Sequence, residues 1–110
     1  MFGDGTTRRD YTYIDDIISG LLAALKFDRS SFEIINLGES QTVELRELVV
    51  LLEKALGKRA TIDYQPLQAG DVPITYADIN KARSLLGYEP RTQIGEGIER
   101  FVKWFKQQSN

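Results

Sequence analysis

The feature that most limits the possible fold is a short apolar run, FEIINL, at residues 32–37, with a glycine directly after it. A run this rich in isoleucine, leucine and phenylalanine is typical of a strand that is covered on both faces, as in a parallel sheet. Only residues 61–64, TIDY, show a second strand pattern, which Pro66 ends. Because two or three strands make a poor sheet, we expect an α/β fold whose larger sheet lies outside this sequence.

Helical spacing of apolar side chains is the second clear pattern. It predicts about four helices, at residues 17–25, 45–56, 79–86 and 94–105. Capping preferences predict where these helices begin and end. We expect starts at Asp15 or Asp16, Thr42, Asp78 and Thr92, and ends at Gly57 and Gly87. The predicted order is turn, helix, strand, helix, strand, loop, helix, helix, within one domain.

Composition excludes several classes of site. The chain has no cysteine and no histidine, so within it we expect no disulfide, zinc site, Cys–His pair or Ser–His–Asp triad. A net charge of −2 argues against a general nucleic-acid binder. The sequence has no apolar run of about 20 residues and no signal peptide, so we expect no membrane partner and a cytoplasmic protein. Because turn residues begin at Gly3, we expect the natural protein to extend upstream of Met1.

The N-terminal stretch GDGTTRRDYTYIDDI begins like a dinucleotide-binding loop at Gly3–Gly5. Arg8 stands where the third glycine of that loop would be, and no strand precedes the turn, so we interpret it as a hairpin turn. The adjacent carboxylates Asp15 and Asp16 could be an acid pair. Their position before an apolar stripe favours roles as helix cap and dipole partner.

Two features are candidates for ligand binding. If Arg8 and Arg9 lie in an extended segment, their side chains point to opposite faces, so one of them can serve a given pocket. A guanidinium suits phosphate, although from the residues alone a solvated pair is the favoured interpretation. The segment Gln68–Asp71 offers a glycine for close backbone approach and a carboxylate for hydroxyl groups. A turn in which Asp71 bonds its own backbone is an equally good interpretation.

Three stretches in this order resemble extended short-chain dehydrogenase/reductases that act on nucleotide sugars. They are GDGTTRRDYTYIDDI, FEIINLGESQTVELRELVVLLEKALGK and LQAGDVPITYADINKARSLLGYEPRTQIGEGIERFVKWF. The chain looks most similar to UDP-glucuronate 4-epimerases and UDP-glucose 4-epimerase-like proteins. The resemblance implies that residues 1–110 are one C-terminal sugar-nucleotide-binding portion. It also implies that the N-terminal NAD-binding Rossmann region is absent, because the glycine-rich loop and the catalytic Tyr-x-x-x-Lys lie upstream in this family.

The resemblance also implies roles for individual residues. Arg9 corresponds to the arginine that binds the diphosphate of the sugar nucleotide, and Gln68–Asp71 to the loop that helps close over it. Galactose-type epimerases tend to carry arginine where this chain has Gln68, so the resemblance does not imply a second phosphate-binding cation. We therefore expect Arg9, Gln68 and Asp71 to bind substrate, and no catalytic, cofactor or metal residue in this chain. Residues 32–37 would form the edge of the dinucleotide-binding sheet.

By this resemblance the parent protein is an NAD-dependent UDP-sugar 4-epimerase, and we expect this chain alone to be inactive. A nucleotide-sugar 4,6-dehydratase or a UDP-glucuronate decarboxylase is the alternative within the class. These share the cofactor and the arginine motif, and the residues that choose the outcome and the sugar lie upstream. An alternative from another class is a non-catalytic interaction module that forms a homodimer through an exposed strand at residues 32–37.

Overall fold

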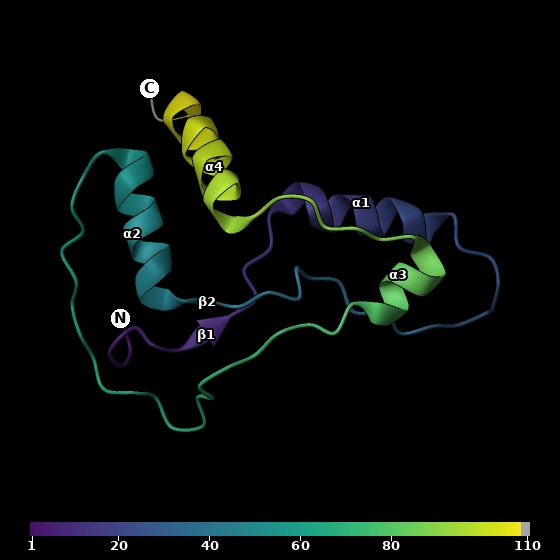
Figure 1. The fold of residues 1–110 in the computed structure, drawn as a ribbon, viewed down its shortest axis with the longest axis horizontal. Coiled ribbons are helices and arrows are strands. Elements are labelled where there is room, and N and C mark those ends of the chain that lie inside the picture. Colours follow the sequence, from purple (N-terminus) through teal and green to yellow (C-terminus); the bar gives the residue numbers. More distant parts are fainter. Residues whose placement is uncertain (109–110) are drawn as a thin grey trace.

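A computed structural model of the chain describes residues 1–108, which contain four α-helices and one short two-stranded sheet. Figure 1 shows α2 and α4 at one end of the molecule and α1 and α3 at the other, with the strands between them. The elements are β1 (Arg8–Arg9), α1 (Ile14–Leu25), β2 (Val43–Glu44), α2 (Leu45–Leu56), α3 (Asn80–Leu86) and α4 (Ile94–Gln108). The prediction of few strands with about four helices is confirmed.

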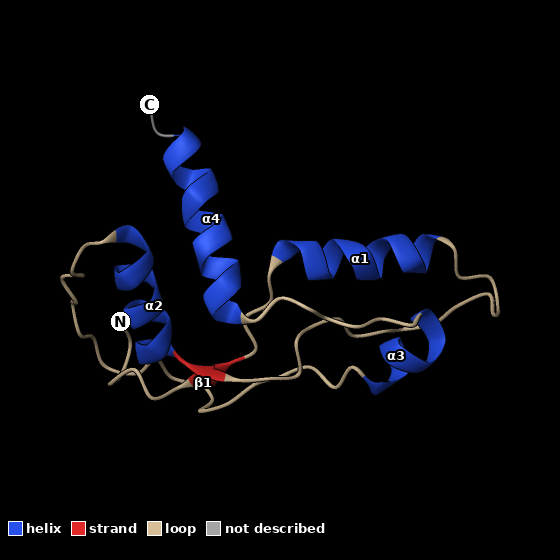
Figure 2. Ribbon diagram, turned by 45° about the horizontal axis from the view of Figure 1, so that its top comes forward, coloured by secondary structure: helices blue, strands red, loops and turns tan. Residues whose placement is uncertain are grey.

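The sheet joins parts of the chain that are distant in sequence. β1 and β2 pair antiparallel, with Arg8 opposite Glu44 and Arg9 opposite Val43 (Figure 2). The turn at Gly3–Gly5 is present, since both glycines have left-handed φ values of 80° and 85°. It does not form a hairpin, because the pairing partner of β1 is β2 rather than the preceding segment.

The two predicted strands, residues 32–37 and 61–64, are not strands in the described chain. The side chains of Phe32 and Ile34 are 76% and 70% exposed. An isolated apolar segment cannot form a strand because each strand needs a neighbour for its backbone hydrogen bonds. Just after the second segment, Gln65 forms a single parallel bridge with Phe2.

Helix ends follow the sequence prediction more closely than helix starts do. Gly57 and Gly87 end α2 and α3 with left-handed φ values of 67° and 66°. The predicted starts are wrong at three helices. The N-cap of α1 is Tyr13 and that of α2 is Glu44, while α4 begins at Ile94, later than a cap at Thr92 would give. Asp78 does accept the N–H of Asn80, at 3.0 Å, although the N-cap of α3 is Ile79.

The molecule is open and has a small core. Its radius of gyration is 16.6 Å, against about 13 Å for a compact domain of this length. Its accessible surface is 8088 Å², against about 6,200 Å² for a folded monomer of this mass. The buried apolar side chains are Ile79, Ala82, Tyr88 and Val102. Large exposed apolar side chains gather on α1 and α4: Ile14, Ile18, Leu21, Leu22 and Leu25 on α1, and Phe101, Trp104 and Phe105 on α4.

Between residues 1 and 108, no helix has both the length and the apolar character that crossing a bilayer requires.

Candidate functional site

The two arginine side chains of β1 contact different partners. This is expected, because successive side chains of an extended segment point to opposite faces. The Nε of Arg8 donates to the Oγ1 of Thr42 at 2.9 Å, and its Nη2 donates to the Thr42 carbonyl at 3.0 Å. Its Nη1 lies 3.3 Å from the Glu44 carboxylate. Arg8 therefore joins β1 to the start of β2, and Thr42 does not cap α2 because that helix begins only after β2, at Leu45.

Arg9 lies against the segment predicted to close over a nucleotide. Its Nη2 donates to Asp71 Oδ1 at 2.7 Å and to the carbonyl of Val72 at 2.9 Å. Its Nη1 donates to the carbonyl of Arg8 at 2.7 Å. The side chains of Arg9 and Asp71 are 29% and 34% exposed, so the ion pair is only partly shielded from water. The fold thus brings two of the predicted binding residues into direct contact across a separation of 62 positions.

The third predicted residue, Gln68, joins through its backbone. Its carbonyl accepts the N–H of Asp71 at 3.1 Å, which closes a turn. Asp71 Oδ1 also accepts the N–H of Val72 at 3.1 Å. The turn interpretation of Asp71 is confirmed, and the same carboxylate also accepts a hydrogen bond from Arg9.

Residues 66–72, which we call the 66–72 loop, are fixed at both ends. The backbone hydrogen bonds at these ends are Gly3 N–H to Gln65 O (2.8 Å), Gln65 N–H to Met1 O (2.7 Å), Arg8 N–H to Pro73 O (2.8 Å) and Thr75 N–H to Arg8 O (3.2 Å). Within the loop, Gly70 has a φ of +83°, and a Cβ placed there would meet no atom within 4 Å. The loop is therefore an exposed segment between two anchored ends, and Arg9 contacts its last two residues, Asp71 and Val72.

A shallow depression of about 640 Å³ opens beside Arg9. Its lining comes from the segments on either side: Arg9, Asp10, Ile35, Asn36, Leu37, Gly38, Thr75, Tyr76 and Ala77. A concave surface of this size, with Arg9 among its lining residues, has the dimensions of a site for part of a small-molecule ligand.

The Asp10 carboxylate joins two of the segments that line this depression. This role was not predicted from the sequence. Its Oδ1 accepts the N–H of Glu39 at 3.0 Å, and its Oδ2 accepts those of Ser40 at 2.9 Å and Ala77 at 3.1 Å. Gly38 fits here because a Cβ would lie 2.7 Å from both the Ala77 Cβ and Asp10 Oδ2. Asp10 follows the arginine pair in the motif, but no local pattern marks its distant partners.

The two carboxylates at the start of α1 have different roles, and neither caps the helix. Asp16 is 5% exposed, and its two oxygens accept the N–H groups of Arg91 and Thr92 at 3.0 Å each. Asp15 is exposed and lies 3.5 Å from Arg100. Asp16 therefore ties α1 to the segment that leads into α4, which corrects the predicted capping role.

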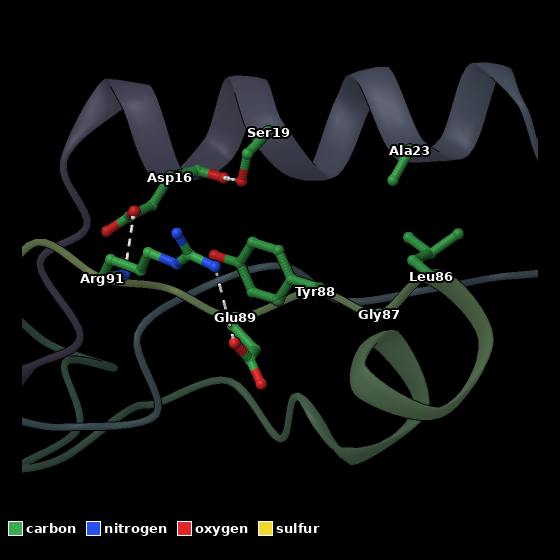
Figure 3. A pocket seen from close by; sticks show the side chains of 8 residues that line it. All are labelled: Asp16, Ser19, Ala23, Leu86, Gly87, Tyr88, Glu89 and Arg91. Carbon is green, nitrogen blue, oxygen red and sulfur yellow. Dashed lines mark hydrogen bonds and ion pairs between the residues drawn. The ribbon is translucent and has the colours of Figure 1, made fainter.

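Figure 3 shows the small cavity of about 240 Å³ next to Asp16, below α1. The hydroxyl of Tyr88 donates to the carbonyl of Gly38 at 2.7 Å. Burial, with the charges of Asp16, Glu39 and Asp10, raises the pKa of Tyr88 to about 12. A tyrosine that removes a proton from substrate needs a pKa near the working pH, so Tyr88 is suited to a structural role.

Glu39 is close enough to the carboxylates of Asp16 and Asp10 to interact with both. Its Oε2 is buried and has no hydrogen-bond partner among the described residues. Burial, the charge of Asp16 and a hydrogen bond with it, and the charge of Asp10 raise the pKa of Glu39 to about 7. The group therefore holds its proton in the folded chain at a pH where an unfolded glutamate would have lost it.

Glu39→Gln is therefore expected to change the pH dependence of stability. Because the folded pKa of about 7 lies above the ordinary value of 4.5, the stabilisation by protonated Glu39 is complete below pH 4.5 and is lost as the pH rises through 7. At pH 8 the variant should exceed the wild type by roughly 1 kcal/mol in free energy of unfolding, since solvent screens the partly exposed group. Thermal melts between pH 4.5 and 8 measure this, and parallel curves for both proteins would contradict it.

Comparison with known proteins shows which family this chain matches and which proteins are similar to it. Residues 1–101 match the family described as GDP-mannose 4,6 dehydratase. A UDP-glucuronate 4-epimerase of Thermodesulfobacterium geofontis is 44% identical over 108 residues, which cover 97% of this chain and 33% of that protein. UDP-glucuronate 4-epimerase 5 of Arabidopsis thaliana is 40% identical, over 92% of this chain and 26% of its own length.

Solved structures show the same relation. The UDP-glucuronic acid 4-epimerase of Bacillus cereus, in complex with UDP-glucuronic acid and NAD, has a TM-score of 0.85 and 39% identity, over 97% of this chain and 34% of its own. The UDP-glucose 4-epimerase of Thermotoga maritima, with UDP-glucose, has a TM-score of 0.89 and 32% identity, over 100% of this chain and 35% of its own. The chain thus spans about a third of the length of these relatives.

Proposed function

Because this chain belongs to the family described as GDP-mannose 4,6 dehydratase, we propose that it is the sugar-nucleotide-binding C-terminal portion of an NAD-dependent UDP-sugar 4-epimerase. The family match confirms the resemblance to extended short-chain dehydrogenase/reductases that act on nucleotide sugars. The observation that carries the proposal is the position of Arg9, which lines the depression and whose partly exposed side chain pairs with Asp71 of the 66–72 loop.

Arg9 has the donors that a diphosphate needs. A guanidinium has five N–H donors, and the contacts of Arg9 to Asp71, Val72 and Arg8 use three of them. Its planar fork can bind two phosphate oxygens side by side once Nη2, which donates to Asp71 and Val72, is released. Binding energy gained at the diphosphate is remote from the reacting carbon and serves to hold the sugar in position for reaction.

The 66–72 loop supplies the second part of the proposed grip. Its ends are fixed beside β1, and Gly70 leaves space above the backbone at its middle. We place Gln68 and Asp71 as ligand contacts from this loop, with the Asp71 carboxylate accepting hydrogen bonds from hydroxyl groups of the nucleotide. The loop would thereby act as a partial lid over the bound nucleotide.

We place the NAD cofactor on a region outside this chain. The Gly3–Gly5 turn leads into the short strand β1, whereas the phosphate-binding turn of a dinucleotide fold leads into a helix. The chemistry that NAD would supply there is reversible hydride transfer at C4 of the sugar, with a base of that same region taking the hydroxyl proton. Residues 32–37 and the exposed apolar face of α1 offer the surface for such a region, and we propose that this chain alone is inactive.

A nucleotide-sugar 4,6-dehydratase or a UDP-glucuronate decarboxylase would use the same grip, because the diphosphate is common to their substrates. A second candidate function comes from the exposed surface. The apolar side chains of α1 and α4 would also suit a non-catalytic module that forms a homodimer. In that function Arg9 would serve the ion pair with Asp71 alone.

Calorimetric titration of the chain with UDP, UDP-glucuronate, UDP-glucose and NAD tests the proposal. We expect one saturable site for UDP and for both UDP-sugars, and no heat of binding from NAD at the same concentrations. Size-exclusion chromatography of the same samples reports the oligomeric state. A stable dimer that ignores every nucleotide would contradict the proposed function and support the interaction module.

A further inference from the structure

We propose that the Asp71 carboxylate competes with phosphate for Arg9. Without a ligand, Asp71 accepts a hydrogen bond from the Arg9 guanidinium, and an incoming diphosphate must displace it. This inference rests on the proposed role of Arg9 as the diphosphate ligand. It adds that the site contains its own competitor, so that binding of the diphosphate and release of the Asp71 side chain from Arg9 are one event.

The contact between the Arg9 and Asp71 side chains has the geometry of a strong hydrogen bond. Arg9 Nη2 lies 2.7 Å from Asp71 Oδ1, within the short range of a charge-assisted hydrogen bond. Carboxylate and phosphate oxygens prefer the same N–H groups of a guanidinium. A diphosphate that approaches Arg9 therefore meets a fork of which one nitrogen already donates to Asp71 and to the carbonyl of Val72.

The 66–72 loop is built so that this contact can open without unfolding its surroundings. The backbone bonds at Gln65, Pro73 and Thr75 fix the two ends on Met1, Gly3 and Arg8. Between these ends, Leu67 lies against Gly3, and Arg9 joins the loop beyond it to β1. At Gly70 a Cβ would meet no atom within 4 Å, so the middle of the loop has no packed neighbour on that side.

Displacement has a second consequence for Asp71. Once a diphosphate holds Arg9, the Asp71 carboxylate loses its cationic partner and becomes free to accept hydrogen bonds from hydroxyl groups. Asp71 should therefore oppose the binding of a bare diphosphate, which has no hydroxyl group. A nucleoside diphosphate has hydroxyl groups on its ribose or its sugar. Their hydrogen bonds to Asp71 return part of the binding free energy that breaking the ion pair costs.

The test compares inorganic pyrophosphate with UDP as probes of the Asp71→Asn variant. We expect pyrophosphate to bind the variant about three- to tenfold more tightly than the wild type, because a partly exposed ion pair no longer has to be broken. The gain for UDP should be smaller. Asp28→Asn, in the exposed turn after α1, changes the net charge equally and should leave both affinities unchanged within about twofold.

Hydrogen exchange provides a readout for the loop itself. Adding pyrophosphate to the wild type should speed amide exchange in residues 68–72, while the Arg8 N–H, which bonds to Pro73, keeps its protection. Asp71→Asn should show the fast exchange without any ligand. Unchanged exchange in both cases would overturn the inference.

The outcomes separate this inference from the proposed function. If UDP and pyrophosphate bind the wild type, and Asp71→Asn binds pyrophosphate no more tightly, the inference is overturned and the proposed function stands. If neither probe binds the wild type or the variant, both are overturned. If pyrophosphate binds the variant alone, the competition by Asp71 is supported in its strongest form.

Discussion

Asp10→Asn is expected to lower the free energy of unfolding by about 2–4 kcal/mol, which is a large part of the stability of a small domain. The Asp10 carboxylate accepts the backbone N–H groups of Glu39, Ser40 and Ala77. An asparagine keeps the shape but replaces one acceptor oxygen by an NH₂ group, which faces donors. At least one N–H, two of which are partly buried, then lacks its partner in the protein, and that loss is the main term.

Urea unfolding followed by circular dichroism measures this effect, with Asp15→Asn as the matched control. Asp15 is exposed, and its ion pair with Arg100 at 3.5 Å should contribute less than about 1 kcal/mol. The account requires a clear difference between the two variants. Equal unfolding midpoints would show that Asp10 does not hold the segments around residues 38–40 and 77 together.

Arg9→Ala is expected to weaken UDP binding about 30- to 100-fold, because charge-assisted hydrogen bonds contribute about 1.5–3 kcal/mol each. Arg9→Lys keeps the charge and loses the fork, so it should show an intermediate loss of roughly tenfold. Arg9→Ala also leaves the Asp71 carboxylate without its cationic partner before any ligand binds.

Isothermal titration calorimetry at two salt concentrations measures these affinities. Arg8→Ala is the matched control, because Arg8 is adjacent in sequence and its side chain bonds to Thr42 and Glu44 instead of the loop. As long as Arg8→Ala remains folded, it should bind UDP within a fewfold of the wild type. Equal losses in the two variants would indicate a general effect of positive charge and would contradict the specific role of Arg9.

Local patterns in the sequence predict the parts of the fold that local forces determine. The apolar stripes of α2 and α4 and the left-handed glycines at the ends of α2 and α3 depend on neighbours within a few residues. The segment at residues 32–37 has an equally clear pattern, yet it is no strand here. A strand depends on a partner, and the described chain offers none to this segment.

The helix starts were predicted wrongly for a related reason. Asp16 and Thr42 have the chemistry of N-caps, but their side chains bind distant groups, at residues 91–92 and Arg8 respectively. A sequence pattern shows that such a side chain can accept a hydrogen bond and does not show which donor it meets. In both cases the donor is a group that the tertiary fold brings close to the side chain.

Some residues of the candidate site were likewise predicted from the sequence, and others were missed. The residue types and the family resemblance singled out Arg9, Gln68 and Asp71, and the structure joins Arg9 directly to Asp71. The resemblance does not predict that an ion pair would already occupy Arg9. Asp10 and Glu39 were missed because their importance comes from long-range contacts: the N–H donors to Asp10, and the carboxylates that surround Glu39.

The central claim is that Arg9 binds the diphosphate of a sugar nucleotide. The most direct measurement is a ¹H–¹⁵N NMR titration with UDP that follows the side-chain Nε–H signals of both arginines of β1. The account predicts a saturable shift of the Arg9 signal together with the amides of the 66–72 loop. The Arg8 signal should stay in place because its Nε–H is bonded to Thr42. A titration in which UDP binds while the Arg9 signal stays fixed would contradict the account.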